Sequence, residues 1–186
     1  VLSAARELRK AIHVLAQNTT EVDLTPEQLL EAAVLVQSAS NKLQGDPLPR
    51  WWGKTQASKG QTSSSYRNRS LFQGELHPFS PTLHWDQYLG PEGEPGYLFE
   101  TTLSSLYEGP PKAVHGGYIA GLYDELLGAV QNLAQGDTGY TAKLTIRYRS
   151  FTPTNENLVF KGWVTHNSGR RISVRASCHD GERLCS

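Results

Sequence analysis

The sequence predicts an α+β fold in which an antiparallel sheet wraps around one long central helix. Residues 118–134 form a strongly apolar stretch that is long enough for a helix and apolar around most of its circumference. Short segments with strand-like patterns precede and follow this stretch, and Gly/Pro/Asn-rich turns separate them. A helix of this kind must be buried, and a sheet wrapped around it would bury it.

The first part of the chain, residues 1–45, is expected to be an N-terminal helical extension. Apolar residues recur at helical spacing until Asn18-Thr19-Thr20 interrupts them. A second helix is expected to begin at Thr25, with threonine as the N-cap, Pro26 at the first helical position and Gln28 completing a capping box. A hairpin this short has little core of its own, so it should pack on the rest of the molecule or on a second subunit.

Residues 46–75 are expected to be a linker or loop, because Pro, Gly, Ser and Gln dominate them. The adjacent pair Trp51-Trp52 is the exception, since two neighbouring tryptophans are costly to expose. The pair is interpreted either as an anchor that holds the linker on the domain surface or as a lid over an acyl pocket.

The remaining residues, 76–186, are expected to form the α+β domain. The strands predicted around the helix are His84–Tyr88, Tyr97–Leu103, Thr141–Tyr148, Leu158–Thr165 and Ile172–Cys178, with Glu182–Ser186 opening a last strand. The pattern over 141–148 is the clearest, because apolar and polar residues alternate strictly along it.

Composition excludes several classes of protein. The 18 basic and 18 acidic side chains balance, which argues against a general nucleic-acid binder. No stretch approaches the ~20 apolar residues of a membrane span, and no secretory signal is visible, so a cytoplasmic protein is expected. Cys178 and Cys185 are expected to be thiols rather than a disulfide. The histidines show no ligand spacing, so neither a metal nor a cofactor is expected.

The chemistry is expected at the start of the central helix, where His115-Gly116-Gly117 is followed by Asp124 nine positions after the histidine. Together with 139–148 and 169–172, this run resembles the PaaI-like branch of the hotdog-fold acyl-CoA thioesterases over roughly residues 84–186. The resemblance implies hydrolysis of a small or medium acyl-CoA to a free acid and CoA. It also assigns Thr141 to the site, where its hydroxyl would help to hold the attacking water.

The residue types suit thioester hydrolysis. Gly116 and Gly117 would place unpaired N–H groups at a helix N-terminus, where negative charge on a carbonyl oxygen is favoured. Asp124 could be a general base on water or a direct nucleophile. His115 could transfer a proton or could be a cap that fixes the loop. Glu125, the neighbour of Asp124, is interpreted as a solvent or interface residue, although some hotdog enzymes use a glutamate on this helix.

Helix geometry constrains how these groups can meet. Gly116 and Asp124 are eight residues apart, which is about 12 Å along a helix. A carboxylate cannot reach a carbonyl held at Gly116 of its own helix, so Asp124 must come from a second copy. A site across a two-fold interface is therefore predicted, in a homodimer or a dimer of dimers.

Binding of the coenzyme A phosphates is expected to involve arginines. The candidates are Arg147, Arg149, Arg170 and Arg171, although each could equally be a solvated strand charge. Proteins of the family often carry an asparagine six residues before the histidine, where this chain has Gly109. That departure leaves open a non-catalytic protein that binds acyl-CoA without turnover.

Overall fold

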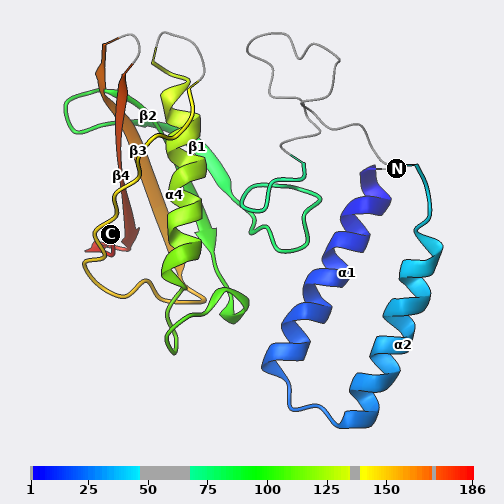
Figure 1. The fold of residues 1–186 in the computed structure, drawn as a ribbon. Coiled ribbons are helices and arrows are strands. Elements are labelled where there is room, and N and C mark those ends of the chain that lie inside the picture. Colours follow the sequence, from blue (N-terminus) through cyan, green and yellow to red (C-terminus); the bar gives the residue numbers. More distant parts are fainter. Residues whose placement is uncertain (1, 47–67, 135–138, 169–170) are drawn as a thin grey trace.

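A computed structural model describes residues 2–46, 68–134, 139–168 and 171–186 (Figure 1). Trp51, Trp52 and Arg170 lie outside the described residues. The elements in chain order are α1 (Leu2–Glu21), α2 (Pro26–Lys42), β1 (His84–Leu89), β2 (Pro95–Thr102), the 3-10 helix η1 (Ser105–Tyr107), α4 (Gly116–Gln131), β3 (Asn157–Asn167), β4 (Ile172–Asp180) and β5 (Arg183–Leu184).

The five strands form one sheet in the order β1-β2-β3-β4-β5, and each strand is antiparallel to the next. The register places Phe99 opposite Phe160 and Phe160 opposite Cys178. Helix α4 packs across one face of the sheet, on β2, β3 and β4 (Figure 1). The predicted α+β class and the sheet around the central helix are confirmed.

The core lies between α4 and the sheet. Its fully buried members include Leu122 and Leu126 from the helix and Phe99 and Phe160 from the strands, whose rings stack with centroids 4.9 Å apart. A Cβ atom at Gly162 of β3 would lie 3.0 Å from the Leu126 side chain, so a glycine there lets the helix lie close to the sheet. The apolar pattern that predicted this helix therefore corresponds to real burial.

The strand predicted at 141–148 is absent. Residues 139–149 belong to no strand, although Leu144 and Ile146 are half-buried and their neighbours are exposed, as the alternation predicted. The backbone N–H groups of Arg149 and Ser150 both donate to the carbonyl of Cys185, beside the short strand β5. Alternation predicts an extended segment, whereas a strand also needs backbone hydrogen bonds to a neighbour, and within the described chain none is recorded for 141–148.

The two N-terminal helices begin and end close to where the sequence predicts. Thr25 caps α2 in a capping box, with its hydroxyl accepting from the Gln28 N–H at 3.3 Å and its own N–H donating to the Gln28 side chain at 2.9 Å. Helix α1 packs on the domain through η1 and through contacts with residues 75–80. Helix α2 instead leaves large apolar side chains more than 60% exposed, namely Leu30, Val34 and Leu35.

Residues 70–73 lie on α4. The ring of Phe72 covers Gly121 and approaches Tyr118, with ring centroids 5.1 Å apart. A Cβ atom at Gly121 would lie 2.0 Å from the Phe72 ring, which no side chain can occupy without a shift. Close approach of this segment to the helix therefore requires glycine at position 121.

The pair Gly121→Ala and Gly128→Ala tests this packing. Both glycines are in α4, but a Cβ atom at Gly128 would meet nothing within 4 Å. We expect Gly121→Ala to lower the free energy of unfolding by about 1–3 kcal/mol through overpacking. Gly128→Ala should raise it by up to about 1 kcal/mol, since alanine favours helix. Urea denaturation measures both, and equal effects from the two variants would contradict the proposed Phe72 packing.

Cys178 and Cys185 are buried, free thiols. Burial is the main cause that raises the pKa of the Cys178 thiol, and the adjacent Cys185 adds to it. The Cys178 thiol is therefore held protonated inside the core. Among the described residues, none of the helices combines the length and the apolar character that crossing a membrane requires.

Candidate active site

His115 is the N-cap of α4. Its backbone is extended, with φ −59° and ψ 128°, and its Nδ1 accepts a hydrogen bond from the Gly117 N–H at 3.0 Å. Its carbonyl accepts from the N–H groups of Tyr118 and Ile119, and its own N–H donates to the carbonyl of Tyr107. The geometry favours the interpretation of His115 as a residue that fixes the loop and starts the helix.

The Gly116 N–H is the vacant donor of this turn. Each of the other N–H groups from residue 113 to residue 119 has a recorded acceptor in the described chain. The sequence predicts two unpaired amides, at Gly116 and Gly117, but the cap formed by His115 occupies the second. One donor therefore remains at the N-terminus of α4, where the helix dipole favours a negative charge.

Gly109 lies against His115. A Cβ atom at position 109 would be 2.9 Å from the Cα of His115 and 3.1 Å from its ring, so the fold leaves no room for a side chain there. The Gly109 N–H donates to the carbonyl of Ala113 at 2.9 Å, so this amide cannot stand in for the family's asparagine. Any carbonyl-binding role in this loop therefore rests on Gly116.

Asp124 and Thr141 are brought together, 17 residues apart in the chain. The Thr141 hydroxyl donates to Oδ1 of Asp124 at 2.7 Å, and both side chains are exposed in the single copy. No other hydrogen bond is recorded for the Asp124 carboxylate within the described residues, so Oδ2 is available to a water or a substrate. The fold thus brings together two residues that the family resemblance assigned to the site.

Glu125, the next residue, has a structural role. Its carboxylate accepts from the Ser70 hydroxyl at 2.7 Å and from the Gln73 side-chain amide at 2.5 Å, and the side chain is half-buried. Within the single copy Glu125 is not a freely solvated residue, because a segment 52 to 55 residues earlier in the sequence covers it. Glu125 holds residues 70–73 on α4.

Tyr148 is a residue of the site that the sequence did not single out. Its hydroxyl donates to the carbonyl of Gly116 at 2.7 Å, and a Cβ atom at Gly116 would lie 3.2 Å from that oxygen. The extended segment 139–148 is therefore fastened to α4 at three points: Tyr148 donates to Gly116, Thr141 donates to Asp124, and the carbonyl of Gly139 accepts from the side chain of Gln131. The alternation placed Tyr148 on the inward face, but no spacing in the sequence connects it to Gly116.

The predicted arginines are not gathered at these groups. Arg147, Arg149 and Arg171 are exposed, and within the described chain no ion pair or side-chain hydrogen bond is recorded for them. No recorded contact joins them to Gly116 or Asp124. The described residues also contain no cluster of three or more His, Cys, Asp or Glu side chains of the kind that holds a metal ion.

Residues 112–186 match the family model of the thioesterase superfamily. A solved structure of a thioesterase superfamily protein aligns with a TM-score of 0.73 at 21% identity, over 97% of this chain and 90% of that one. A second, from Shewanella loihica PV-4, aligns with a TM-score of 0.41 at 24% identity, over 50% of this chain and 77% of its own. The BH2602 protein of Bacillus halodurans, determined with CoA, aligns with a TM-score of 0.45 at 21% identity, over 54% and 66%. No curated protein matches the sequence significantly.

The family match over residues 112–186 confirms the predicted resemblance to the thioesterase superfamily, and the first of these structures confirms the fold. An alignment over 97% of the chain necessarily includes the N-terminal helices, so they belong to the shared fold. The superfamily indicates thioester hydrolysis as the class of reaction. The narrower assignment to the PaaI-like branch stays a prediction.

Proposed function

Because residues 112–186 match the thioesterase superfamily, we propose that the protein hydrolyses an acyl-CoA thioester to a free acid and CoA. One observation carries the proposal. Helix α4 presents a vacant N–H at Gly116 and an exposed carboxylate at Asp124, and segment 139–148 fastens itself to both positions. These are the two groups that thioester hydrolysis needs.

The Gly116 N–H polarises the thioester carbonyl. As water adds, the carbonyl oxygen becomes an oxyanion, and a preorganised donor aimed at it stabilises the transition state by about 3 kcal/mol. The absence of a side chain lets the substrate approach the backbone closely. Tyr148, bonded to the carbonyl of the same residue, positions this turn and touches neither water nor substrate.

The Asp124 carboxylate activates the water. It removes a proton as the water oxygen attacks the carbonyl carbon, and the C–S bond then breaks to release the CoA thiolate. Direct attack by the carboxylate, with an anhydride that water opens, uses the same atoms. The Thr141 hydroxyl donates a hydrogen bond to Oδ1 of Asp124. Its oxygen lone pairs can still accept a hydrogen bond from the attacking water.

The two groups act on one substrate only if two copies of α4 meet. The helix is continuous from Gly116 to Gln131. Gly116 and Asp124 are eight residues apart, so they are separated by about 12 Å along the helix axis. We therefore propose a homodimer, alone or within a dimer of dimers, in which each site takes Gly116 from one copy and Asp124 from the other. The arginines Arg147, Arg170 and Arg171 are proposed to meet the phosphates of CoA.

Mixed dimers test this arrangement. Co-expression of Asp124→Asn and Gly116→Pro chains, each inactive alone, creates one intact site in every mixed dimer and none in the parents. A statistical mixture should recover about a quarter of the wild-type activity, since half of its dimers are mixed and each has one of two sites. CoA release is followed with a thiol reagent. No recovery in purified mixed dimers would contradict the shared site, and so would full activity in a monomer.

An acyl-CoA series separates catalysis from binding alone. Steady-state turnover and equilibrium binding are measured on the same acyl chain lengths with the wild-type protein. Turnover that rises above the uncatalysed rate and saturates with substrate supports the proposal. Saturable binding with no turnover at any chain length would instead identify an acyl-CoA-binding protein.

A further inference from the structure

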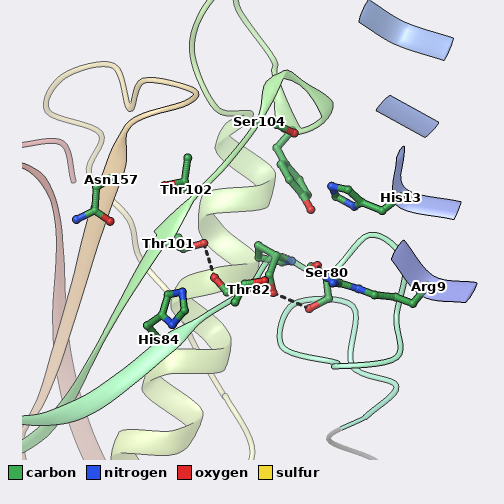
Figure 2. Close-up of a pocket in the computed structure, with 11 residues that line it drawn as sticks. Arg9, His13, Ser80, Thr82, His84, Thr101, Thr102, Ser104 and Asn157 are labelled. Atoms are coloured by element: carbon green, nitrogen blue, oxygen red, sulfur yellow. Dashed lines mark hydrogen bonds between the residues drawn. The ribbon is translucent and has the colours of Figure 1, made fainter. Parts of the chain in front are cut away.

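A polar cavity of about 420 Å³ lies where α1 meets the domain (Figure 2). Its walls come from α1, from residues 80–84, from the end of β2 with the start of η1, and from the start of β3. None of its lining residues belongs to the proposed active site. A volume of this size accommodates a small organic ligand.

The charge of the lining has one sign. Arg9, His13 and His84 contribute to the walls, and no Asp or Glu does. Glu100 accepts from the side-chain amide of the lining residue Asn157 at 3.1 Å, but it does not itself line the cavity. The cavity therefore favours a ligand that carries negative charge.

Arg9 is the centre of this charge. Its Nε donates to the carbonyl of His77 at 3.3 Å and its Nη2 donates to the carbonyl of Ser80. These carbonyls carry no net charge, and no carboxylate of the described chain lies within 4.0 Å of the half-buried guanidinium. The positive charge acts on its surroundings: burial is the larger cause that lowers the pKa of His77, and Arg9 is the second.

His13 also favours a negatively charged ligand. Its Nδ1 lies 2.8 Å from the carbonyl of Pro78, which can only accept, so Nδ1 carries a proton. The ring extends from α1 towards the cavity, with Nε2 left for a ligand (Figure 2). Arg9 and His13 are four residues apart on one helix, so both reach the same side of α1.

The rest of the lining is hydrogen-bonding rather than apolar. Thr102, Ser104 and Asn157 offer hydroxyl and amide groups to the cavity. The hydroxyls of Thr101 and Ser80 instead donate hydrogen bonds to backbone carbonyls. A hydrocarbon chain would leave these groups without partners. Oxygen atoms of a ligand would satisfy them.

We propose that this cavity binds a small oxyanion, a phosphate or a carboxylate group, as a second ligand site at the junction of α1 and the domain. The bound anion neutralises Arg9 and bridges α1 to β2 and β3. It therefore holds the N-terminal extension on the domain. The proposal does not depend on the hydrolytic activity, and its tests do not use that activity.

The matched variants are Thr102→Glu and Thr102→Gln. Thr102 is exposed at the cavity wall and makes no recorded hydrogen bond to α1, so neither change removes the contacts that dock the helix. The two side chains have nearly the same shape and differ in one negative charge. We expect Thr102→Glu to bind the anion at least tenfold more weakly than Thr102→Gln.

Isothermal titration of the full chain measures binding, with inorganic phosphate in one arm and succinate in the other, at constant ionic strength set by chloride. Lys10→Gln, which removes an exposed cation on α1 that lies outside the cavity and, within the described chain, pairs only with Glu7 of the same helix, should leave the affinity unchanged. Saturable binding of either probe supports the proposal and identifies the preferred group. Absence of saturable binding in both arms would overturn it, and so would equal affinity in the Glu and Gln variants.

Discussion

Replacement of Asp124 by asparagine is expected to lower kcat for acyl-CoA hydrolysis by about 10²–10⁴-fold, the usual contribution of a positioned general base. Asparagine has nearly the same shape, and its Oδ1 can still accept the Thr141 hydroxyl, which lies 2.7 Å from Oδ1 of the aspartate. It cannot take a proton from water or attack a carbonyl. The loss should therefore fall on kcat, with KM changed little.

The neighbouring carboxylate provides the matched control. Glu125→Gln makes the same chemical change one residue away, at a side chain that binds Ser70 and Gln73 and faces no proposed substrate. We expect it to keep kcat within a few-fold of wild type while thermal unfolding shifts to lower temperature. A Glu125 variant with the larger loss of kcat, or an Asp124 variant that keeps most of its activity, would refute the assignment of the catalytic carboxylate.

Replacement of Gly116 by proline is expected to lower kcat by about 10²–10³-fold, the effect of removing one donor from an oxyanion hole. Proline deletes the N–H and little else, because the first position of a helix tolerates proline. The preceding residue, His115, already has φ −59° and ψ 128°, which suits a residue before proline. No backbone hydrogen bond is lost in the described chain, since the Gly116 N–H has no recorded acceptor.

Gly116→Ala is the control for the proline variant. Both side chains add a Cβ atom 3.2 Å from the Tyr148 hydroxyl, so the steric effect is shared and only the N–H differs. We expect alanine to retain most of the wild-type kcat, with both variants unfolding at similar urea concentrations. Equal rates for alanine and proline would show that the Gly116 amide does not contact the reacting carbonyl.

More of the fold than of the candidate site can be predicted from the sequence. Helix α4, five of the six expected strands and the capping box at Thr25 follow from patterns that extend over a few residues. The segment 141–148 has the same kind of pattern and is extended, but it is not a strand. The difference is a pairing partner, which no local pattern specifies.

In the candidate site, too, the local sequence and the folded chain decide different features of adjacent residues. Asp124 and Glu125 are adjacent carboxylates, and family resemblance selected Asp124. Only the folded chain shows that Ser70 and Gln73 donate hydrogen bonds to Glu125, whereas Thr141 donates a hydrogen bond to Asp124. Likewise, two glycine amides follow His115, and the histidine ring takes one of them.

By itself, the sequence determined where most of the helices and strands lie and which stretch of α4 is the candidate for the chemistry, because hydrogen bonding and burial of apolar faces repeat with fixed local periods. The tertiary structure alone decided that the Gly116 amide is vacant, that Tyr148 supports its turn, and that Arg9 and His13 of α1 meet β2 across a polar cavity. These features join segments that lie up to about 90 residues apart, and contact at such separations depends on how the whole chain packs.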